Sequence, residues 1–125
     1  VIITDPEGRI DYVNAGFTRM TGISAEEAKG KIPGRLLQGE HTDPDTVRTI
    51  RENLKLRRPF VVEILNYTKS RKPHWISLSI NPVFDKSGKV ERYVSVQVDI
   101  TETKQRALEA VEHETITSRV SETGT

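Results

Sequence analysis

Three apolar segments that alternate with a period of two follow one another between Phe60 and Asp99. Because successive side chains of a β-strand point to opposite faces, this alternation predicts strands that each turn one face toward the interior. Short polar turns separate the segments, so we expect an antiparallel three-stranded meander. The turn sequences are Lys69-Ser70-Arg71-Lys72 and Asp85-Lys86-Ser87-Gly88-Lys89.

The start of the chain predicts a second, smaller piece of sheet. Val1 to Thr4 and Ile10 to Val13 are short apolar runs, and the turn signal Asp5-Pro6-Glu7-Gly8 lies between them. Such a pattern is typical of a hairpin. Together with the meander it predicts a five-stranded antiparallel sheet with short helices on one face, an α+β fold.

Helix signals fill the stretch between the hairpin and the meander. Asn14 is placed to cap a first helix that ends at Gly22, and we expect Phe17 and Met20 in the core. Ser24-Ala25-Glu26-Glu27 has the pattern of a capping box, in which the first and last side chains each bond the backbone of the other. A second short helix is therefore predicted directly after the first.

The longest helix before the meander is expected to begin at Asp43-Pro44, where the aspartate supplies the cap and the proline fits the first helical position. Its apolar residues recur at helical spacing at Val47, Ile50 and Leu54. Residues 31–42 lack such a period, so we expect a loop that contains a short turn of helix. A last helix is predicted after the meander, with Thr101 as its cap.

Composition excludes several classes of function. The chain has 125 residues, enough for one domain and a tail, and its net charge of +1 does not favour nucleic acid or a membrane surface as a partner. It has no cysteine, which excludes disulfides, thiolate metal sites and cysteine nucleophiles. His41, His74 and His113 lack metal-ligand spacing, and no catalytic motif occurs. We therefore expect a non-catalytic, cytoplasmic piece of a longer polypeptide.

The order of elements, with two strands, short helices, one longer helix and a meander that ends in Asp99-Ile100-Thr101, resembles the PAS family over about residues 1 to 103. The resemblance implies a sensor domain over residues 1–101 and a connector helix or tail over residues 102–125. In that family the connector runs on to an effector such as a histidine kinase or a cyclic-dinucleotide enzyme. We also expect a homodimer, with Leu108, Val111 and the exposed face of the meander as candidate contacts.

Within this family, three segments resemble the flavin-binding segments of the light-oxygen-voltage subfamily. They are Pro33-Gly34-Arg35-Leu36-Leu37-Gln38-Gly39, Asn66-Tyr67-Thr68-Lys69 and Val96-Gln97-Val98-Asp99. The cofactor-binding residues that the resemblance implies are Arg35, Gln38, Arg51, Asn66 and Gln97, and the implied cofactor is FMN or FAD. The chemistry suits such a role, because guanidinium groups bind phosphate and carboxamides both donate to and accept from a ring edge.

Three departures from the subfamily concern the ring itself. Gly34 stands in place of the photoactive cysteine, Pro33 in place of the asparagine before it, and Ile76 in place of the second ring-binding asparagine. Ile76 offers no polar contact, which costs a bound flavin roughly 1 to 3 kcal/mol for each buried group left unsatisfied. Without a cysteine, the covalent thiol adduct is excluded.

Two functions stay open on these grounds. The first is a sensory or dimerisation module that binds an unidentified small molecule or partner and transmits its state through residues 97–101. The alternative is a flavin-binding redox or blue-light sensor that works without a cysteinyl adduct. The site residues also have plainer roles: Asn66 and Gln97 can bond each other, the backbone or water, while Arg35 and Arg51 can pair with carboxylates such as Glu40 or Glu52.

Overall fold

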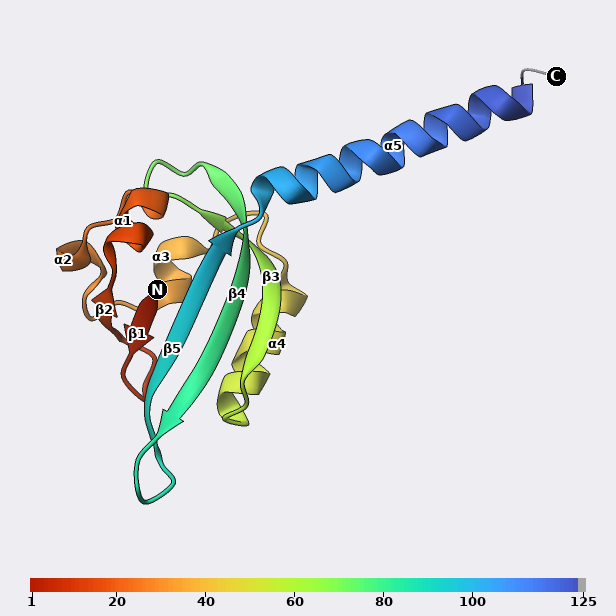
Figure 1. Cartoon of the computed structure of the whole chain (residues 1–125). Helices are drawn as coiled ribbons and strands as arrows, with labels where there is room; N and C mark the ends of the chain where they lie inside the picture. The colour runs from red at the N-terminus through yellow and green to blue at the C-terminus, as the bar shows by residue number, and fades with distance from the viewer. Residues whose placement is uncertain (124–125) are drawn as a thin grey trace.

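The computed structural model describes residues 1–123, and the surroundings of side chains up to residue 113. Figure 1 shows a sheet with helices behind it and a long helix that leaves the body. In chain order the elements are β1 (Ile2–Thr4), β2 (Ile10–Val13), α1 (Ala15–Thr21), α2 (Ala25–Ala28), α3 (Pro33–Leu37), α4 (Pro44–Lys55), β3 (Phe60–Tyr67), β4 (Pro73–Phe84), β5 (Val90–Asp99) and α5 (Thr101–Thr123).

The predicted five-stranded sheet is confirmed, and all its pairings are antiparallel. Its strand order is β2-β1-β5-β4-β3, so the N-terminal hairpin joins the meander along the edge of β5. The register places Leu78 opposite Gln97 and Ile64 opposite Ile76. Because directly opposite residues share a face, these side chains all point toward the helices.

The helix starts follow the predicted capping chemistry. The side chain of Asn14 accepts from the backbone N–H of Phe17 at 3.0 Å, and Asp43 caps α4 by accepting from Asp45 at 2.9 Å. The capping box of α2 forms in both directions between Ser24 and Glu27. These bonds satisfy backbone donors that a helix start leaves without partners.

The hydrophobic core lies between β1, β2 and the first three helices, with Ile2, Ile10, Val13, Phe17, Ile23, Ala28 and Leu37 buried together. The predicted core position of Phe17 is confirmed, but that of Met20 is wrong, because Met20 is only partly buried. Thr21, four residues after Phe17, takes the buried position, and its hydroxyl donates to the carbonyl of Phe17 at 2.8 Å. Residues four apart lie on the same side of a helix, which explains the exchange.

The start of α5 departs from the prediction in one detail. Thr101 is the first residue of the helix, and its backbone N–H donates to Oδ1 of Asp99 at 2.9 Å. The hydroxyl of Thr101 instead accepts from the backbone N–H of Trp75 on β4, also at 2.9 Å. The aspartate therefore caps the helix, while the threonine fastens it to the sheet.

Beyond its first turn α5 extends away from the body (Figure 1). Lys104 in that turn lies 3.3 Å from a carboxylate oxygen of Glu63 and 4.5 Å from the ring centre of Trp75. The second half of the predicted tail is helical as far as Thr123. Within residues 1–123, no helix combines the length and the apolar character that a membrane crossing needs.

The loop after α3 is held by a close approach between Gly39 and Tyr67. The hydroxyl of Tyr67 accepts from the backbone N–H of His41 at 2.9 Å, and the guanidinium of Arg71 lies over the ring at 4.7 Å from its centre. A Cβ atom at Gly39 would lie 2.4 Å from Cε2 of Tyr67, a distance that forces the ring to move.

We therefore expect Gly39→Ala to destabilise the domain by about 1 to 3 kcal/mol, the range typical of overpacking. The free energy of unfolding can be measured by denaturant titration. Gly16→Ala is the matched control: its Cβ would lie no closer than 3.6 Å to any neighbour, and alanine favours a helix by roughly 0.5 to 1 kcal/mol over glycine. Equal stability of the two variants would contradict the close-approach argument.

Candidate functional site

A cavity of about 620 Å³ lies between the sheet and the helices α3 and α4. That volume falls within the range of pockets that bind small molecules. The apolar row predicted on α4 is not packed into a core; it borders this cavity. The aliphatic lining consists of Ile2, Ile32, Leu37, Val47, Ile50, Leu54, Ile64, Leu78 and Ile80.

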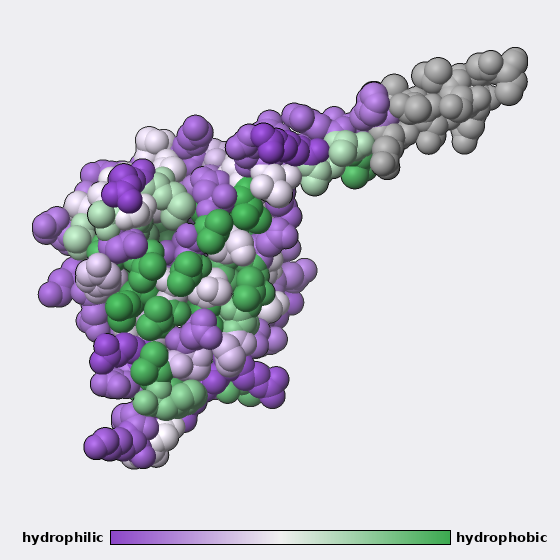
Figure 2. Space-filling view, in the orientation of Figure 1, coloured by the Kyte–Doolittle hydropathy of each residue, from purple (hydrophilic) through white to green (hydrophobic). Residues whose placement is uncertain are grey.

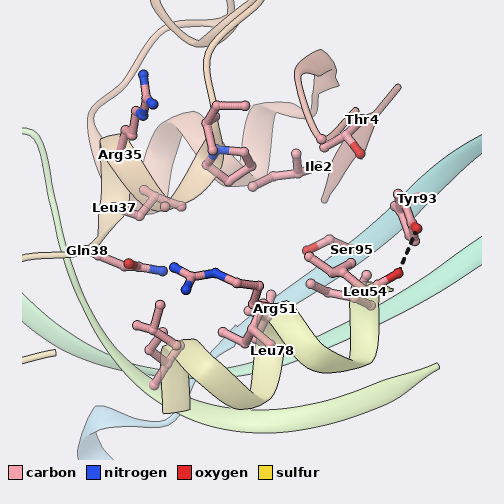
Figure 3. A pocket seen from close by; sticks show the side chains of 18 of the residues that line it. Ile2, Thr4, Arg35, Leu37, Gln38, Arg51, Leu54, Leu78, Tyr93 and Ser95 are labelled. Atoms are coloured by element: carbon pink, nitrogen blue, oxygen red, sulfur yellow. Dashed lines mark hydrogen bonds between the residues drawn. The ribbon is translucent and has the colours of Figure 1, made fainter. Parts of the chain in front are cut away.

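All five residues that the resemblance implied for cofactor binding line this one cavity. Arg35 belongs to α3 and Gln38 directly follows it, Arg51 belongs to α4, Asn66 lies near the end of β3, and Gln97 lies on β5. Figure 3 shows Arg35 and Gln38 on α3 and at its end, and Arg51 on α4, which lies across from them. The fold thus brings these residues together, and their role in binding stays a prediction.

The two amides on the sheet carry acceptors that nothing satisfies. Asn66 is 5% exposed, and its Oδ1 has no hydrogen-bond partner. The Nε2 of Gln97 donates to Oγ of Ser95, while its Oε1 is buried and also without a partner. The two amides therefore do not bond each other, which was one of the plainer roles open to them. Since a buried acceptor without a partner costs about 1 to 3 kcal/mol, both oxygens favour a ligand that presents N–H donors.

The two arginines are free of protein partners. Among residues 1–113, no hydrogen bond or ion pair engages the guanidinium group of Arg35 or of Arg51, so the alternative pairs with Glu40 and Glu52 do not form. Arg51 extends across the cavity toward Gln38, whereas the guanidinium of Arg35 points away from Arg51 (Figure 3). Only Arg51 is thus presented to the cavity interior, and a two-arginine clamp on a phosphate would require Arg35 to turn.

The departures from the light-oxygen-voltage pattern have different structural consequences. Gly34 lines the cavity, and a Cβ atom there would lie 3.0 Å from Nε2 of Gln38, a flexible side chain that can move. Ile76 is 1% exposed and is not part of the lining; it fills the core opposite Ile64 and Asp99. The residues present therefore fit a flavin at its N–H edge and at one phosphate contact, and they lack one polar partner for the ring.

Sequence reasoning missed several residues of the lining. Tyr93 and Ser95 alternate in phase with Gln97 and could have been found by that signal; the hydroxyl of Tyr93 donates to the carbonyl of Leu54 at 3.2 Å (Figure 3). The hairpin turn at Pro6, Glu7 and Gly8 also lines the cavity. No local signal indicates that contribution, because it depends on the pairing of β1 with β5.

A second polar cluster lies where the sheet meets α5. Burial lowers the pKa of His74 below its ordinary value, although the nearby carboxylate of Asp99 acts in the opposite direction. For Asp99, burial would raise the pKa, but the hydrogen bonds with Thr101 and the nearby imidazole of His74 together outweigh it and hold the pKa below its usual range. At neutral pH this junction therefore holds a neutral imidazole beside a charged carboxylate.

Comparison with known proteins supports the same reading of the fold. The family model of the PAS domain matches residues 1–102. The chain is 36% identical over 104 residues to the blue-light-activated histidine kinase of Brucella canis, covering 83% of this chain and 21% of that protein. It is 37% identical over 97 residues to blue-light-activated histidine kinase 1 of Erythrobacter litoralis, covering 78% and 27% respectively. The chain thus spans about a fifth to a quarter of the length of these curated relatives.

Solved structures give a matching result. A light-oxygen-voltage domain studied with a flavin analogue is 33% identical, with a TM-score of 0.78, over 90% of this chain and 85% of that one. The dark structure of the blue-light photoreceptor Aureochrome1 LOV is 31% identical, with a TM-score of 0.79, over 92% and 83%. With its sheet order, its cavity and its exiting helix, the chain belongs to the PAS domain family and is similar to the light-oxygen-voltage domains within it.

Proposed function

We propose that this PAS domain senses the occupant of its cavity and passes that state through β5 and α5 to a histidine kinase effector in the same polypeptide, in the cytoplasm. The names of the curated relatives support a kinase effector. The observation that carries the proposal is on a single strand: Gln97 lines the cavity, and Asp99, two residues later, caps α5. A ligand that prefers one arrangement of Gln97 shifts the population of arrangements at the start of α5.

Replacing Gln97 by leucine tests this connection. We expect Gln97→Leu to change the amide hydrogen exchange of the first turn of α5, because the strand that carries the cap loses its contact with Ser95. Exchange is measured by mass spectrometry on residues 1–125. Asn81→Leu, on the same sheet but outside the cavity lining, is the control. Unchanged exchange in Gln97→Leu would refute transmission along β5.

A flavin is the second candidate occupant, and specific contacts favour it. The open acceptors of Asn66 and Gln97 match the N–H edge of a flavin ring, and Arg51 is available for a phosphate. A bound flavin would supply light absorption or electron transfer, while the protein residues orient it and exclude water. Because Gly34 replaces the cysteine of the subfamily, signalling would proceed without a bond to the protein.

This candidate is tested by reconstitution with FMN and with FAD, followed by visible absorption and a binding titration. We expect flavin to bind, and Asn66→Leu to weaken it about 3- to 10-fold, the effect of one net hydrogen bond. Asn81→Leu introduces the same change on the sheet outside the cavity and should bind normally. A protein that stays colourless after reconstitution would reject flavin while leaving the sensory proposal intact.

The outer face of the sheet favours a second copy of the chain as partner. Figure 2 shows apolar side chains gathered over this face. Val96 and Val98 form a ridge on β5 with exposures of 42% and 54%, and Val61 is 67% exposed on β3. Between them the small side chains of Ser77 and Ser79 on β4 make a trough, since the register places these residues side by side.

The valine ridge and the serine trough run side by side along the strands, so this face is complementary in shape to a second copy of itself. When a second copy is related by a two-fold axis along the strands, the valine ridge of each copy lies over the serine trough of the other. The same symmetry places both α5 helices at one end, where the exposed side chain of Leu108 is available for a contact between helices. We therefore infer a parallel homodimer with the two connectors side by side.

We expect Val96→Glu to weaken this dimer at least about 10-fold, because a carboxylate would be buried in each copy without a partner. Sedimentation over a range of concentrations measures the dissociation constant. Leu56→Glu, at an exposed apolar position directly after α4, is the control and should leave association unchanged. A natural sequence that stays monomeric at every concentration would contradict the homodimer.

A further inference from the structure

His74 is a buried titratable group that none of the foregoing uses. Its exposure is 6%, and among residues 1–113 it is the only buried histidine, lysine, arginine or carboxylate. Such groups are rarely buried without a partner. The position of His74 near the start of β4 places it between the cavity wall and the first residues of α5.

The imidazole lies between the side chains of Asn66 and Asp99 and is hydrogen-bonded to neither. Its Nδ1 is 3.6 Å from Oδ2 of Asp99, within ion-pair distance but too long for a hydrogen bond. Its Nε2 is buried and has no partner. Asn66, whose Oδ1 is also without a partner, is directly opposite His74 in the pairing of β3 with β4. Side chains at such positions lie side by side, with Cβ atoms about 4.5 to 5.5 Å apart.

The two neighbours of His74 belong to different parts of the structure, one to the cavity and the other to the start of α5. Asn66 lines the cavity. Asp99 holds the start of α5 through the bond between its Oδ1 and the backbone of Thr101. Trp75, the next residue after His74, accepts from Ile100 and donates to the hydroxyl of Thr101, both at 2.9 Å. The histidine thus lies between a residue of the cavity lining and the groups that hold the start of the helix.

We propose that His74 relays the state of Asn66 at the cavity wall to Asp99, and through Asp99 to the first turn of α5. The relay rests on the proposed sensory function of the cavity and adds a route separate from Gln97. A neutral imidazole carries one proton, which Nε2 can donate to Asn66 or Nδ1 can donate to Asp99. When a ligand donates a hydrogen bond to Oδ1 of Asn66, that oxygen can no longer accept from Nε2 of His74. The proton of the imidazole is then more stable on Nδ1, from which it is donated to Asp99. This bond draws the carboxylate of Asp99 away from Thr101 and toward β4.

Protonation of the His74 ring also draws the carboxylate of Asp99 toward β4. The relay can therefore be tested by a change of pH, without a ligand. The charged groups that act on His74 are Asp99 from β5 and Lys72 from the turn before β4; Glu63 of β3 and Lys104 of α5 pair with each other beside Trp75. Burial lowers the pKa of His74 relative to the unfolded chain. The folded protein then binds fewer protons, so its stability falls as the pH drops below about 6.5 and levels off below the folded pKa.

The experiment follows the backbone amide of Thr101 and the histidine rings by NMR between about pH 5 and pH 8, on residues 1–125 without ligand. We expect the Thr101 amide to titrate with the midpoint of His74. The titration should vanish in His74→Phe, whose ring keeps the shape but carries no proton, and in His74→Gln, which keeps polarity if the phenylalanine variant fails to fold. His41→Phe is the matched control, since His41 is 74% exposed, and should leave the Thr101 curve unchanged.

The cavity end of the relay is tested in Asn66→Leu. The midpoint of His74 should fall in this variant, because leucine offers no oxygen to which Nε2 of the protonated ring could donate. A flat Thr101 resonance in the natural sequence, or a curve that persists in His74→Phe, would overturn the relay. The relay would also be overturned if Asn66→Leu left the titration midpoint of His74 unchanged, because His74 would then not respond to the cavity wall. Failure to bind added FMN would count against the flavin candidate and leave these results standing.

Discussion

The pairing of β4 with β5 is the constraint on which the site and its output both depend. Its register sets Leu78 opposite Gln97, so that the amide faces the cavity, and Ile76 opposite Asp99, so that the carboxylate reaches the start of α5. A slip of one residue would turn both polar groups to the outer face, because side chains alternate along a strand. Sensing and transmission are thus coupled by strand geometry.

The cavity lies where α4, which contacts the sheet along β3, leaves its apolar row unpacked. Its apolar row at Val47, Ile50 and Leu54 is only partly buried, since it faces open space instead of the aliphatic side chains of the strands. The unsatisfied oxygens of Asn66 and Gln97 give that space a preferred chemistry. An apolar hollow with a few fixed acceptors orients a planar ligand with N–H groups on one edge.

Much of the fold could be predicted from local signals. The alternation in the meander, the caps at Asn14 and Asp43 and the capping box at Ser24 depend only on neighbours in sequence, and each has the predicted form. The prediction for Met20 failed because a short helix offers too few turns to distinguish its faces. At Thr101 the predicted cap and the observed bonds differ, since the hydroxyl finds a donor on β4 that no local pattern reveals.

The sequence by itself determined the elements, the absence of a thiol and five of the polar side chains that line the cavity. Only the tertiary structure decided which of these groups are satisfied, that Arg35 points away from Arg51, and that His74 lies between Asn66 and Asp99. The physical reason is that backbone propensities and caps act over a few residues. Burial, free hydrogen-bond acceptors and the pKa of a histidine depend instead on strands brought together from distant parts of the chain.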